Sequence, residues 1–289
     1  MVIGASGQLG SDLCQELDAA SFDWRSPSHA ELDICEHAKV AAHLRSSRPA
    51  VIINLAAFHQ LERCEADPVR AFEVNCHAVR NLAEIAGDLE AHLVHVSTDY
   101  VFGGDQDEPY EERSAPNPLQ VYGVSKLAGE YFVRNRLQRH LLVRTSGLYG
   151  TRGSSGKGGN FVETMLRLGQ QSGRVRVVTD QVLSPTNTRD LSAMIVRLIR
   201  ARATGLFHVT NSGACSWFEF AERIFALSGQ DVELVPIPTS LSGSTVARPA
   251  FSVLGNRRLK SEGFGLMRSW EDAVGDYLRQ RTRAVVAVR

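Results

Sequence analysis

The stretch MVIGASGQLGSDLCQEL, residues 1–17, decides the fold of this chain. A short apolar run is followed by glycines spaced G-x-x-G-x-x-G, at Gly4, Gly7 and Gly10. Leucines then recur every four residues across Gln8–Ala20, which predicts an amphipathic helix. Glycines between a strand and a helix let backbone N–H groups at the helix N-terminus approach a pyrophosphate. The spacing alone also occurs in ordinary turns, so the surrounding sequence must decide between the two interpretations.

The first half of the chain alternates apolar runs with helical patterns, such as the one at Val69–Ala86, and another helix is expected to begin near Val121. This alternation is typical of βαβ units and a parallel sheet. It predicts an α/β, Rossmann-type doubly wound fold. The expected strands are Met1–Ile3, Ser21–Trp24, Ala50–Ala57, His92–Ser97, His140–Ser146 and, later, residues 205–211. The first of these is so short that the natural start of the chain is left open.

The second half has a different texture, with a Gly/Ser-rich loop at Gly150–Asn160 and an irregular stretch at Pro236–Pro249. Loops of this length in a compact domain usually have a function. We therefore expect an NAD(P)-binding domain over residues 1–146, to which strand 205–211 and nearby helices return. Residues 147–289 are expected to form mainly a small, discontinuous substrate-binding lobe.

Composition excludes several classes of protein. With 32 basic and 32 acidic side chains the net charge is +0, so no general field would attract nucleic acid or an anionic membrane. Apolar runs are too short to span a bilayer, and none follows a basic leader. The 5 cysteines include no C-x-x-C pair. We expect a soluble, cytoplasmic protein with reduced cysteines, no metal site and no nucleic-acid or membrane partner; a homodimer stays open.

Cofactor choice depends on the end of the second expected strand, where an acid binds a ribose 2′-hydroxyl and a base or serine accommodates a 2′-phosphate. Arg25 and Ser26 follow Trp24 at this point, which favours NADP, whereas a small register error would place Asp23 there and favour NAD. Small residues at the end of another strand, Ala56 and Ala57, would let a dinucleotide lie close.

A tyrosine and a lysine carry the most specific signal for chemistry. Tyr122 and Lys126 are four residues apart on a predicted helix and so share one face. An adjacent ammonium stabilises a phenolate, so the phenol can donate a proton to a carbonyl oxygen as hydride arrives at its carbon. A surface Tyr/Lys pair is the plain alternative. The hydroxyls of Ser97 and Thr98 at a strand end, where sites of doubly wound sheets collect, favour the catalytic interpretation.

Other polar clusters are interpreted as structural. Lys157 in the Gly-rich loop is followed by Gly158, which excludes a P-loop. His59, His77 and His95 have no metal-ligand spacing. The acidic residues of the segment that follows the strand at His92–Ser97 are expected to form a solvated loop; they are Asp99, Asp105, Asp107 and Glu108.

Taken together, the chain resembles the dTDP-4-dehydrorhamnose reductase family of extended short-chain dehydrogenase/reductases over nearly its whole length. The segments that carry the resemblance are GASGQLG, ELDI, INLAAF, CEADPVRAFEVN, LVHVSTDYVFGG, NPLQVYGVSKLAGE, VRTSGLYG, GNFVETMLR, DQVLSPT and RPAFSVL. The resemblance implies catalytic roles for Thr98, Tyr122 and Lys126 in the NAD(P)H-dependent reduction of a nucleotide-linked 4-keto-6-deoxy sugar. It also implies binding residues: Gln8 and Leu9 at the pyrophosphate, Asp33 and Ile34 at the adenine, Asn160 and Arg248 at the substrate diphosphate, and Tyr100 at the sugar.

The chain departs from the family beside the sugar. Gly147 stands where the family usually has Trp, and His59 where it usually has Thr. We expect the loop Gly150–Gly159, with His59, to supply the missing wall, so another sugar or another product stereochemistry fits equally well. Two further hypotheses are a non-catalytic NADP-binding protein, like the regulatory subunit of methionine adenosyltransferase, and a sugar-nucleotide epimerase or dehydratase.

Overall fold

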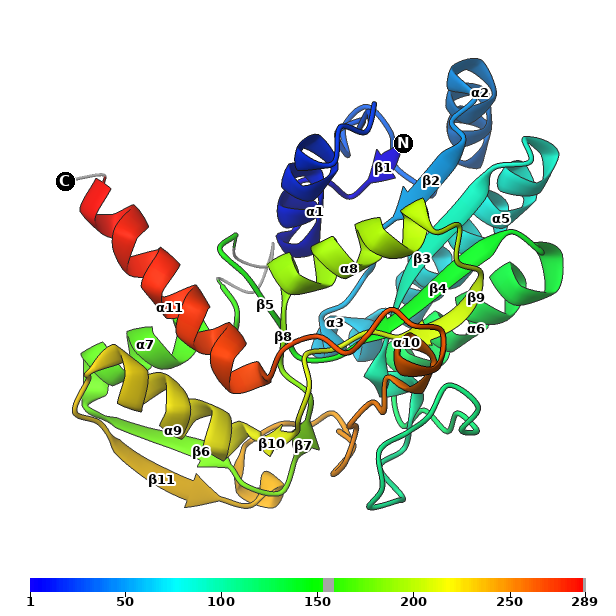
Figure 1. Ribbon diagram of the computed structural model, residues 1–289. Helices are drawn as coiled ribbons and strands as arrows, with labels where there is room; N and C mark the ends of the chain where they lie inside the picture. The colour runs from blue at the N-terminus through cyan, green and yellow to red at the C-terminus, as the bar shows by residue number, and fades with distance from the viewer. Residues whose placement is uncertain (153–158, 288–289) are drawn as a thin grey trace.

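Five parallel strands form the central sheet, in the order β1-β2-β3-β4-β9 (Figure 1). This computed structural model describes residues 1–152 and 159–287, with side chains as far as Arg281. All neighbouring strands run in the same direction, so their carboxyl ends share one edge of the sheet. The α/β fold class predicted from the sequence is confirmed. The strands are β1 (Val2–Ile3), β2 (Val51–Asn54), β3 (His92–Thr98), β4 (His140–Thr145) and β9 (Gly205–His208).

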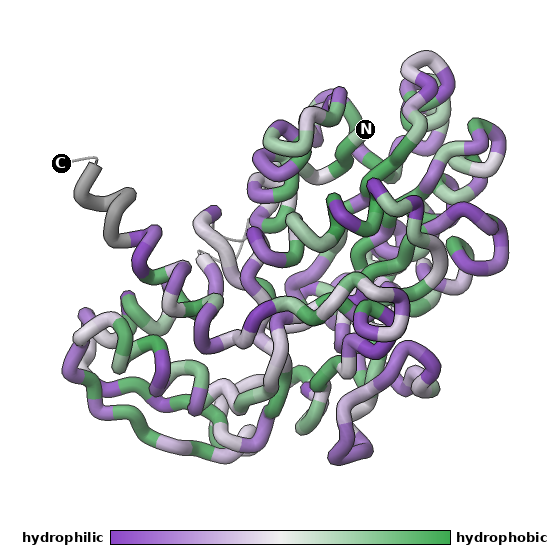
Figure 2. The backbone as a smooth tube through the Cα atoms, viewed as in Figure 1, coloured by the Kyte–Doolittle hydropathy of each residue, from purple (hydrophilic) through white to green (hydrophobic). Residues whose placement is uncertain are grey.

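Helices cover both faces of this sheet because its strands are apolar on both sides. One face packs against α1 (Gln8–Ala19) and α8 (Thr188–Arg200), with α10 (Arg257–Ser261) beside β9. The other face packs against α2 (His37–Ser47), α5 (Ala78–Asp88) and α6 (Val121–Arg136). Burial of each large apolar side chain stabilises such cores by about 1.5–3 kcal/mol. Figure 2 shows the strands between these layers as mostly hydrophobic.

The prediction of a strand at Ser21–Trp24 is wrong. The chain reverses at Ser21, which has a positive φ of 57°, and then runs along the free edge of β1. Only one backbone hydrogen bond joins the two described segments, from the Val2 N–H to the Arg25 carbonyl at 2.8 Å. Because β1 has only 2 residues, it offers too few partners for a ladder, although Phe22 and Trp24 still pack against the core.

The helix predicted at Val69–Ala86 is interrupted by a π turn. It consists of α4 (Pro68–Phe72), the π turn η1 (Glu73–His77) and α5, with the short helix α3 (Leu61–Ala66) before it. The π turn holds Asn75, whose amide exchanges hydrogen bonds with the backbone of Phe58 and donates to Ser125 Oγ at 3.0 Å. The interruption thus anchors the segment after β2 to helix α6, as π turns near functional sites often do.

A second group of elements lies at the lower left of Figure 1 and has an aromatic-rich core of its own, which includes Phe220, Trp270 and Tyr277. Its parallel pair β6 and β11 includes part of the stretch 236–249 that was expected to be irregular. Within the described residues, no helix has the length and apolar character needed to cross a bilayer. The helices are α7 (Phe161–Ser172), α9 (Trp217–Ser228) and α11 (Trp270–Ala287); the strands are β6 (Arg174–Val178), β11 (Glu233–Ile237), β5 (Leu148–Tyr149), β8 (Thr186–Asn187), β7 (Val182–Leu183) and β10 (Cys215–Ser216).

Candidate active site

The glycine turn between β1 and α1 packs too closely against its neighbours to admit side chains at Gly4 and Gly10, and it forms the cradle at the start of α1. Gly4 has a φ of +85°, and a Cβ on Gly10 would lie 2.3 Å from the Gly4 carbonyl oxygen. Gly7 caps α1 without a side-chain hydrogen bond, and the buried Oε1 of Gln8 has no partner among the described residues. Leu9 is buried in the core beneath. Open backbone donors at a helix N-terminus, next to an unpaired buried amide, fit a dinucleotide pyrophosphate.

The other predicted cofactor residues surround this cradle. A Cβ on Gly4 would lie 3.0 Å from the Ala56 nitrogen and 3.2 Å from the Leu55 carbonyl carbon, so the glycine turn touches the chain just after β2, one residue before Ala57. Arg25 is exposed, and its carbonyl accepts the bond from β1 described above. The remaining three have local partners: Ser26 Oγ donates to the Pro27 carbonyl, Asp33 Oδ2 accepts from Arg70, and Ile34 is buried beside α2.

The end of β3 meets the start of α6. Thr98 is the last residue of β3, and its side chain lies close enough to that of Tyr122 to affect the Tyr122 pKa. Burial raises the pKa of Tyr122, and the Thr98 side chain opposes this rise. The ring of Tyr100 stands edge-on to that of Tyr122, with 6.2 Å between the centroids. The structure thus brings together side chains that the sequence separates.

Lys126 lies behind Tyr122 on the same helix and is only 2% exposed. Its Nζ donates to the Val96 carbonyl at 2.7 Å and lies 3.2 Å from His95 Nε2. Burial lowers the pKa of Lys126 to about 8, and the carboxylate of Glu130 opposes this effect. A proton can therefore be held or released here near neutral pH.

Asp99 is not part of a solvated loop, contrary to the sequence-based expectation. It is 4% exposed, and its Oδ2 accepts hydrogen bonds from Ser146 Oγ at 2.8 Å and from Ser252 Oγ at 2.7 Å. Its Oδ1 accepts from the Thr98 hydroxyl at 3.2 Å. Burial raises the pKa of Asp99. This carboxyl therefore ties the candidate catalytic threonine to Ser146, just after β4, and to Ser252. Ser252 belongs to residues 242–256, the stretch before α10 that we call the C-terminal segment.

Arg248 faces the same region from the C-terminal segment. Its guanidinium forms an ion pair with Glu62 of α3, with 3.0 Å between Nη2 and Oε1, and a hydrogen bond with the Tyr100 side chain. Burial raises the pKa of Tyr100 to about 12, and the carboxylate of Asp99 adds to the rise. Arg248 is thus linked through Tyr100 to the Thr98 and Tyr122 pair.

The other predicted substrate residues have different surroundings. Asn160 caps α7, accepting from the Glu163 N–H and donating to the Gly150 carbonyl, and it has no hydrogen bond with Tyr122 in the described part of the chain. His59 Nδ1 lies 3.4 Å from the Ala57 carbonyl, near the end of β2.

Gly147 has a positive φ of 55°, and a Cβ there would lie 2.7 Å from Leu183 Cδ1 and 3.1 Å from Pro185 Cα. The space beside this glycine is therefore filled by Leu183 and Pro185. The Gly-rich loop was expected to supply a wall here, but its residues 153–158, including Lys157, lie outside the described residues.

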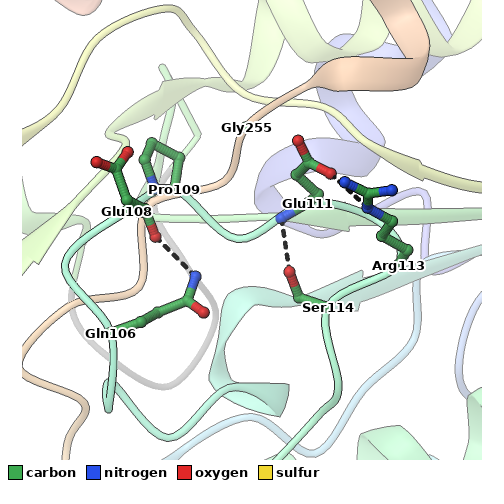
Figure 3. Close-up of a pocket in the computed structure, with 7 residues that line it drawn as sticks. All are labelled: Gln106, Glu108, Pro109, Glu111, Arg113, Ser114 and Gly255. Atoms are coloured by element: carbon green, nitrogen blue, oxygen red, sulfur yellow. Dashed lines mark hydrogen bonds and ion pairs between the residues drawn. The ribbon is translucent and has the colours of Figure 1, made fainter.

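Sequence reasoning missed Asn54, His95 and Asp99 as polar groups of the site. For Asn54 and His95 the signal was a polar side chain inside a strand that is apolar on both faces, whereas Asp99 follows directly after β3 and has no such signal. A separate surface pocket lies among the charged residues of loop 106–114, where Glu111 and Arg113 pair (Figure 3). None of its lining residues belongs to the predicted site.

Comparisons with known proteins agree over the length of the chain. Residues 1–283 match the family described as RmlD substrate binding domain. The spore coat polysaccharide biosynthesis protein SpsK of Bacillus subtilis is 36% identical over 98% of both chains. A dTDP-4-keto-6-deoxy-D-glucose reductase of Streptomyces niveus is 37% identical, over 95% of this chain and 94% of that one. The crystal structure of a Bacillus anthracis dTDP-4-dehydrorhamnose reductase with NADP is 39% identical, with a TM-score of 0.92 over 96% of this chain and 98% of that one.

Proposed function

The chain belongs to the RmlD substrate binding domain family, and we propose that it reduces the keto group of a dTDP-linked 4-keto-6-deoxy sugar with NADPH. The observation that carries this proposal is the position of three groups around the carboxyl end of β3, where Thr98 ends the strand and α6 carries Tyr122 and Lys126. A hydroxyl, a phenol and a buried amine, from Thr98, Tyr122 and Lys126, lie together where doubly wound sheets bind their ligands.

Each of these groups has a distinct task in the proposed reaction. Bound NADPH would supply the hydride to the keto carbon. Tyr122 gives its hydroxyl proton to the keto oxygen, so the oxygen ends as an alcohol and Tyr122 as a phenolate. The ammonium of Lys126 stabilises that phenolate. The Thr98 hydroxyl, which donates to Asp99 in the free protein, would turn its proton to the keto oxygen and orient it beside Tyr122.

The cofactor would be held by the glycine cradle at the N-terminus of α1. Gly4, Gly7 and Gly10, with Gln8 and Leu9, would face its pyrophosphate; the absence of a Cβ at Gly10 lets the helix pack directly on the turn at Gly4 and Ala5. Arg25 and Ser26 take the 2′-phosphate, which favours NADPH over NADH. The remaining contacts are Asp33 and Ile34 at the adenine, Ala56 and Ala57 along the dinucleotide, and Lys126 at the nicotinamide end.

The substrate would lie between β3 and the C-terminal segment. Arg248 is the cation placed for its diphosphate, and Tyr100 stands between Arg248 and Tyr122, next to the sugar. The proposed substrate-binding residues also include His59, Gly147 and Asn160. Residues 1–146, with strand 205–211, then form the cofactor domain and residues 147–289 mainly the substrate lobe.

A panel of dTDP-4-keto-6-deoxy sugars tests the function directly. We expect NADPH consumption with at least one of them, and NMR of the product to show a new alcohol at carbon 4 with one defined configuration. A protein that binds NADPH but reduces none of these sugars would instead fit the non-catalytic regulatory hypothesis. Equilibration of two epimers without net NADPH consumption would favour an epimerase.

A cytoplasmic location and a homodimer remain parts of the proposal. Cys14, Cys35, Cys76 and Cys215 form no disulfide among the described residues, which fits a reducing compartment. Val124 and Tyr131 are exposed on α6, seven positions apart and so on one face, where a second copy could pack. Sedimentation of the purified protein tests the dimer.

A further inference from the structure

A buried polar chain runs from Lys126 across two strands of the sheet. Asn54 on β2 and His95 on β3 are register partners, and both are 0% exposed. The Ala56 N–H donates to Asn54 Oδ1 at 3.1 Å, and Asn54 Nδ2 lies 3.1 Å from His95 Nδ1. His95 Nε2 lies 3.2 Å from Lys126 Nζ. The chain therefore joins the candidate catalytic lysine to a backbone amide at the cofactor end of β2.

The direction of these hydrogen bonds constrains the charge of Lys126. A backbone N–H can only donate, so Asn54 turns its oxygen to Ala56 and its NH₂ group to His95. His95 Nδ1 must then accept, which places the ring proton on Nε2, facing Lys126. An ammonium has no lone pair to accept that proton, whereas a neutral amine has one. Every bond of the chain is therefore satisfied only when Lys126 is neutral.

The electrostatic surroundings allow Lys126 to be either an ammonium or a neutral amine. Burial keeps the pKa of His95 well below its usual range, so its ring is neutral. Among the described residues, the charged group that favours the Lys126 ammonium is Glu130, which Arg144 of β4 holds in a buried ion pair at 2.6 Å. The π turn contributes the uncharged Asn75, bonded to Ser125.

We propose that Asn54 and His95 are positioning residues that couple the charge of Lys126 to the hydrogen bond at Ala56. When Lys126 is an ammonium, it donates to His95 Nε2, and the ring proton sits on Nδ1. Asn54 must then turn its oxygen to His95 and release the Ala56 N–H. When Lys126 loses one proton to solvent, the ring proton sits on Nε2 and Asn54 returns to Ala56. The ring carries one proton in both states.

This coupling has a consequence for catalysis that rests on the proposed function. The phenolate left on Tyr122 needs the Lys126 ammonium, so reduction should slow as the pH rises through the pKa of Lys126, about 8 in the free protein. Asn54 favours the neutral amine, because its NH₂ group donates to His95. A group that only accepts at position 54 would favour the ammonium instead.

The coupling itself is tested in the free protein by NMR, without substrate or turnover. With histidine labelled in ¹⁵N, the His95 signals, assigned with His95→Gln, should change from the Nδ1–H to the Nε2–H pattern near pH 8. The amide proton of Ala56 should shift with the same midpoint. A single His95 tautomer from pH 6 to 10, or a tautomer change that leaves Ala56 unmoved, would overturn the proposal.

Asn54→Asp provides the kinetic test. Its carboxylate keeps the shape of the side chain and can accept from both Ala56 and His95, which fixes the Nδ1–H tautomer and the Lys126 ammonium. The midpoint of the alkaline fall in the reduction rate should move up by about one pH unit or more. At a pH well above the wild-type midpoint, the variant should therefore reduce the substrate roughly tenfold faster than the wild type. His92→Gln, a change at another buried histidine of β3, should leave the profile in place.

The two experiments separate the possible failures. An Asn54→Asp profile that coincides with the wild type, in a folded protein, would contradict the coupling. If no dTDP sugar is reduced but the His95 tautomer and the Ala56 amide still titrate together, the proposed function is wrong and the coupling stands. If Asn54→Asp does not fold, the NMR titration of the wild-type protein decides alone.

Discussion

The proposed reacting end and the proposed substrate end of the site, here called the reacting end and the substrate end, are built differently. Around Tyr122, the supporting groups Thr98, Lys126 and Asp99 are 7%, 2% and 4% exposed, and each has more than one hydrogen-bond or ionic partner. At the substrate end, the ion pair of Arg248 and Glu62 has side chains 28% and 59% exposed. A buried hydrogen-bond network fixes the geometry of its side chains. Water screens an exposed ion pair, so replacing one of its partners costs little free energy. The difference suggests that the chemistry is rigidly placed and that recognition begins from an ion pair the substrate can replace.

Tyr122→Phe should give the largest effect, because it removes the proton donor at the rigid end. We expect kcat to fall by about 10² to 10⁴, the range for loss of a general acid, while NADPH still binds. Tyr131→Phe, an exposed tyrosine on the same helix, is the matched control and should change neither. Near-normal turnover by Tyr122→Phe would remove Tyr122 from the mechanism and with it the contrast between the two ends.

Asp99→Ala tests the rigidity of the reacting end. Three hydroxyls lose their acceptor, partly offset by relief of a buried charge, so the free energy of unfolding should fall by about 3 kcal/mol in urea denaturation. Burial raises the pKa of Asp99 in the folded state, so the folded protein binds the proton more tightly than the unfolded chain. The difference in the free energy of unfolding between Asp99→Ala and the wild type should therefore shrink as the pH rises from about 4.

Asp107→Ala, an exposed carboxylate a few residues away, is the control for Asp99→Ala and should be neutral within about 0.5 kcal/mol. Equal stability of Asp99→Ala and wild type would mean that the three hydroxyls find other partners. The reacting end would then be no more rigid than the substrate end.

Arg25→Ala extends the comparison to the exposed side of the cofactor site. If Arg25 pairs with the 2′-phosphate, NADPH binding should weaken by roughly 1.5 to 3 kcal/mol, with little change for NADH. Calorimetric titration with both cofactors measures this, and Arg223→Ala on the exposed side of α9 serves as the control. A similar loss for both cofactors would leave Arg25 without a role in cofactor choice.

Glu62→Gln should give the smallest effect, in the favourable direction. An exposed ion pair contributes about 0 to 1 kcal/mol, so freeing Arg248 from Glu62 should lower KM for the nucleotide sugar by at most about fivefold, with kcat unchanged. Arg248→Ala should raise KM instead. A higher KM in Glu62→Gln would mean that Glu62 positions Arg248 for the substrate rather than competing with it.

The main sheet and the Tyr122 and Lys126 pair could be predicted because their signals are periodic. Apolar runs at β2, β3 and β4 and the leucines of α1 each report burial directly. The strand at Ser21–Trp24 could not be judged this way, since its pairing depends on the length of β1, a property of another segment.

The buried network could not be predicted from local pattern. Asp99 looks like an ordinary polar residue at the start of a loop, and although His95 stands out inside an apolar strand, only the parallel register of β2 with β3 places Asn54 beside it. Likewise, the filling of the space at Gly147 by Leu183 follows from the tertiary path of residues far apart in sequence. Such contacts are set by the assembled fold, so they require coordinates.

The most direct test of the central claim is transfer of deuterium from the cofactor to the substrate. NADPH deuterated at nicotinamide carbon 4 on the transferred face, incubated with a dTDP-4-keto-6-deoxy sugar and the wild-type protein, should give a product with one deuterium at sugar carbon 4. NMR of the product reads the position and configuration, and Tyr122→Phe should form it far more slowly. A product without deuterium at carbon 4, or no product from any such sugar, would contradict the account.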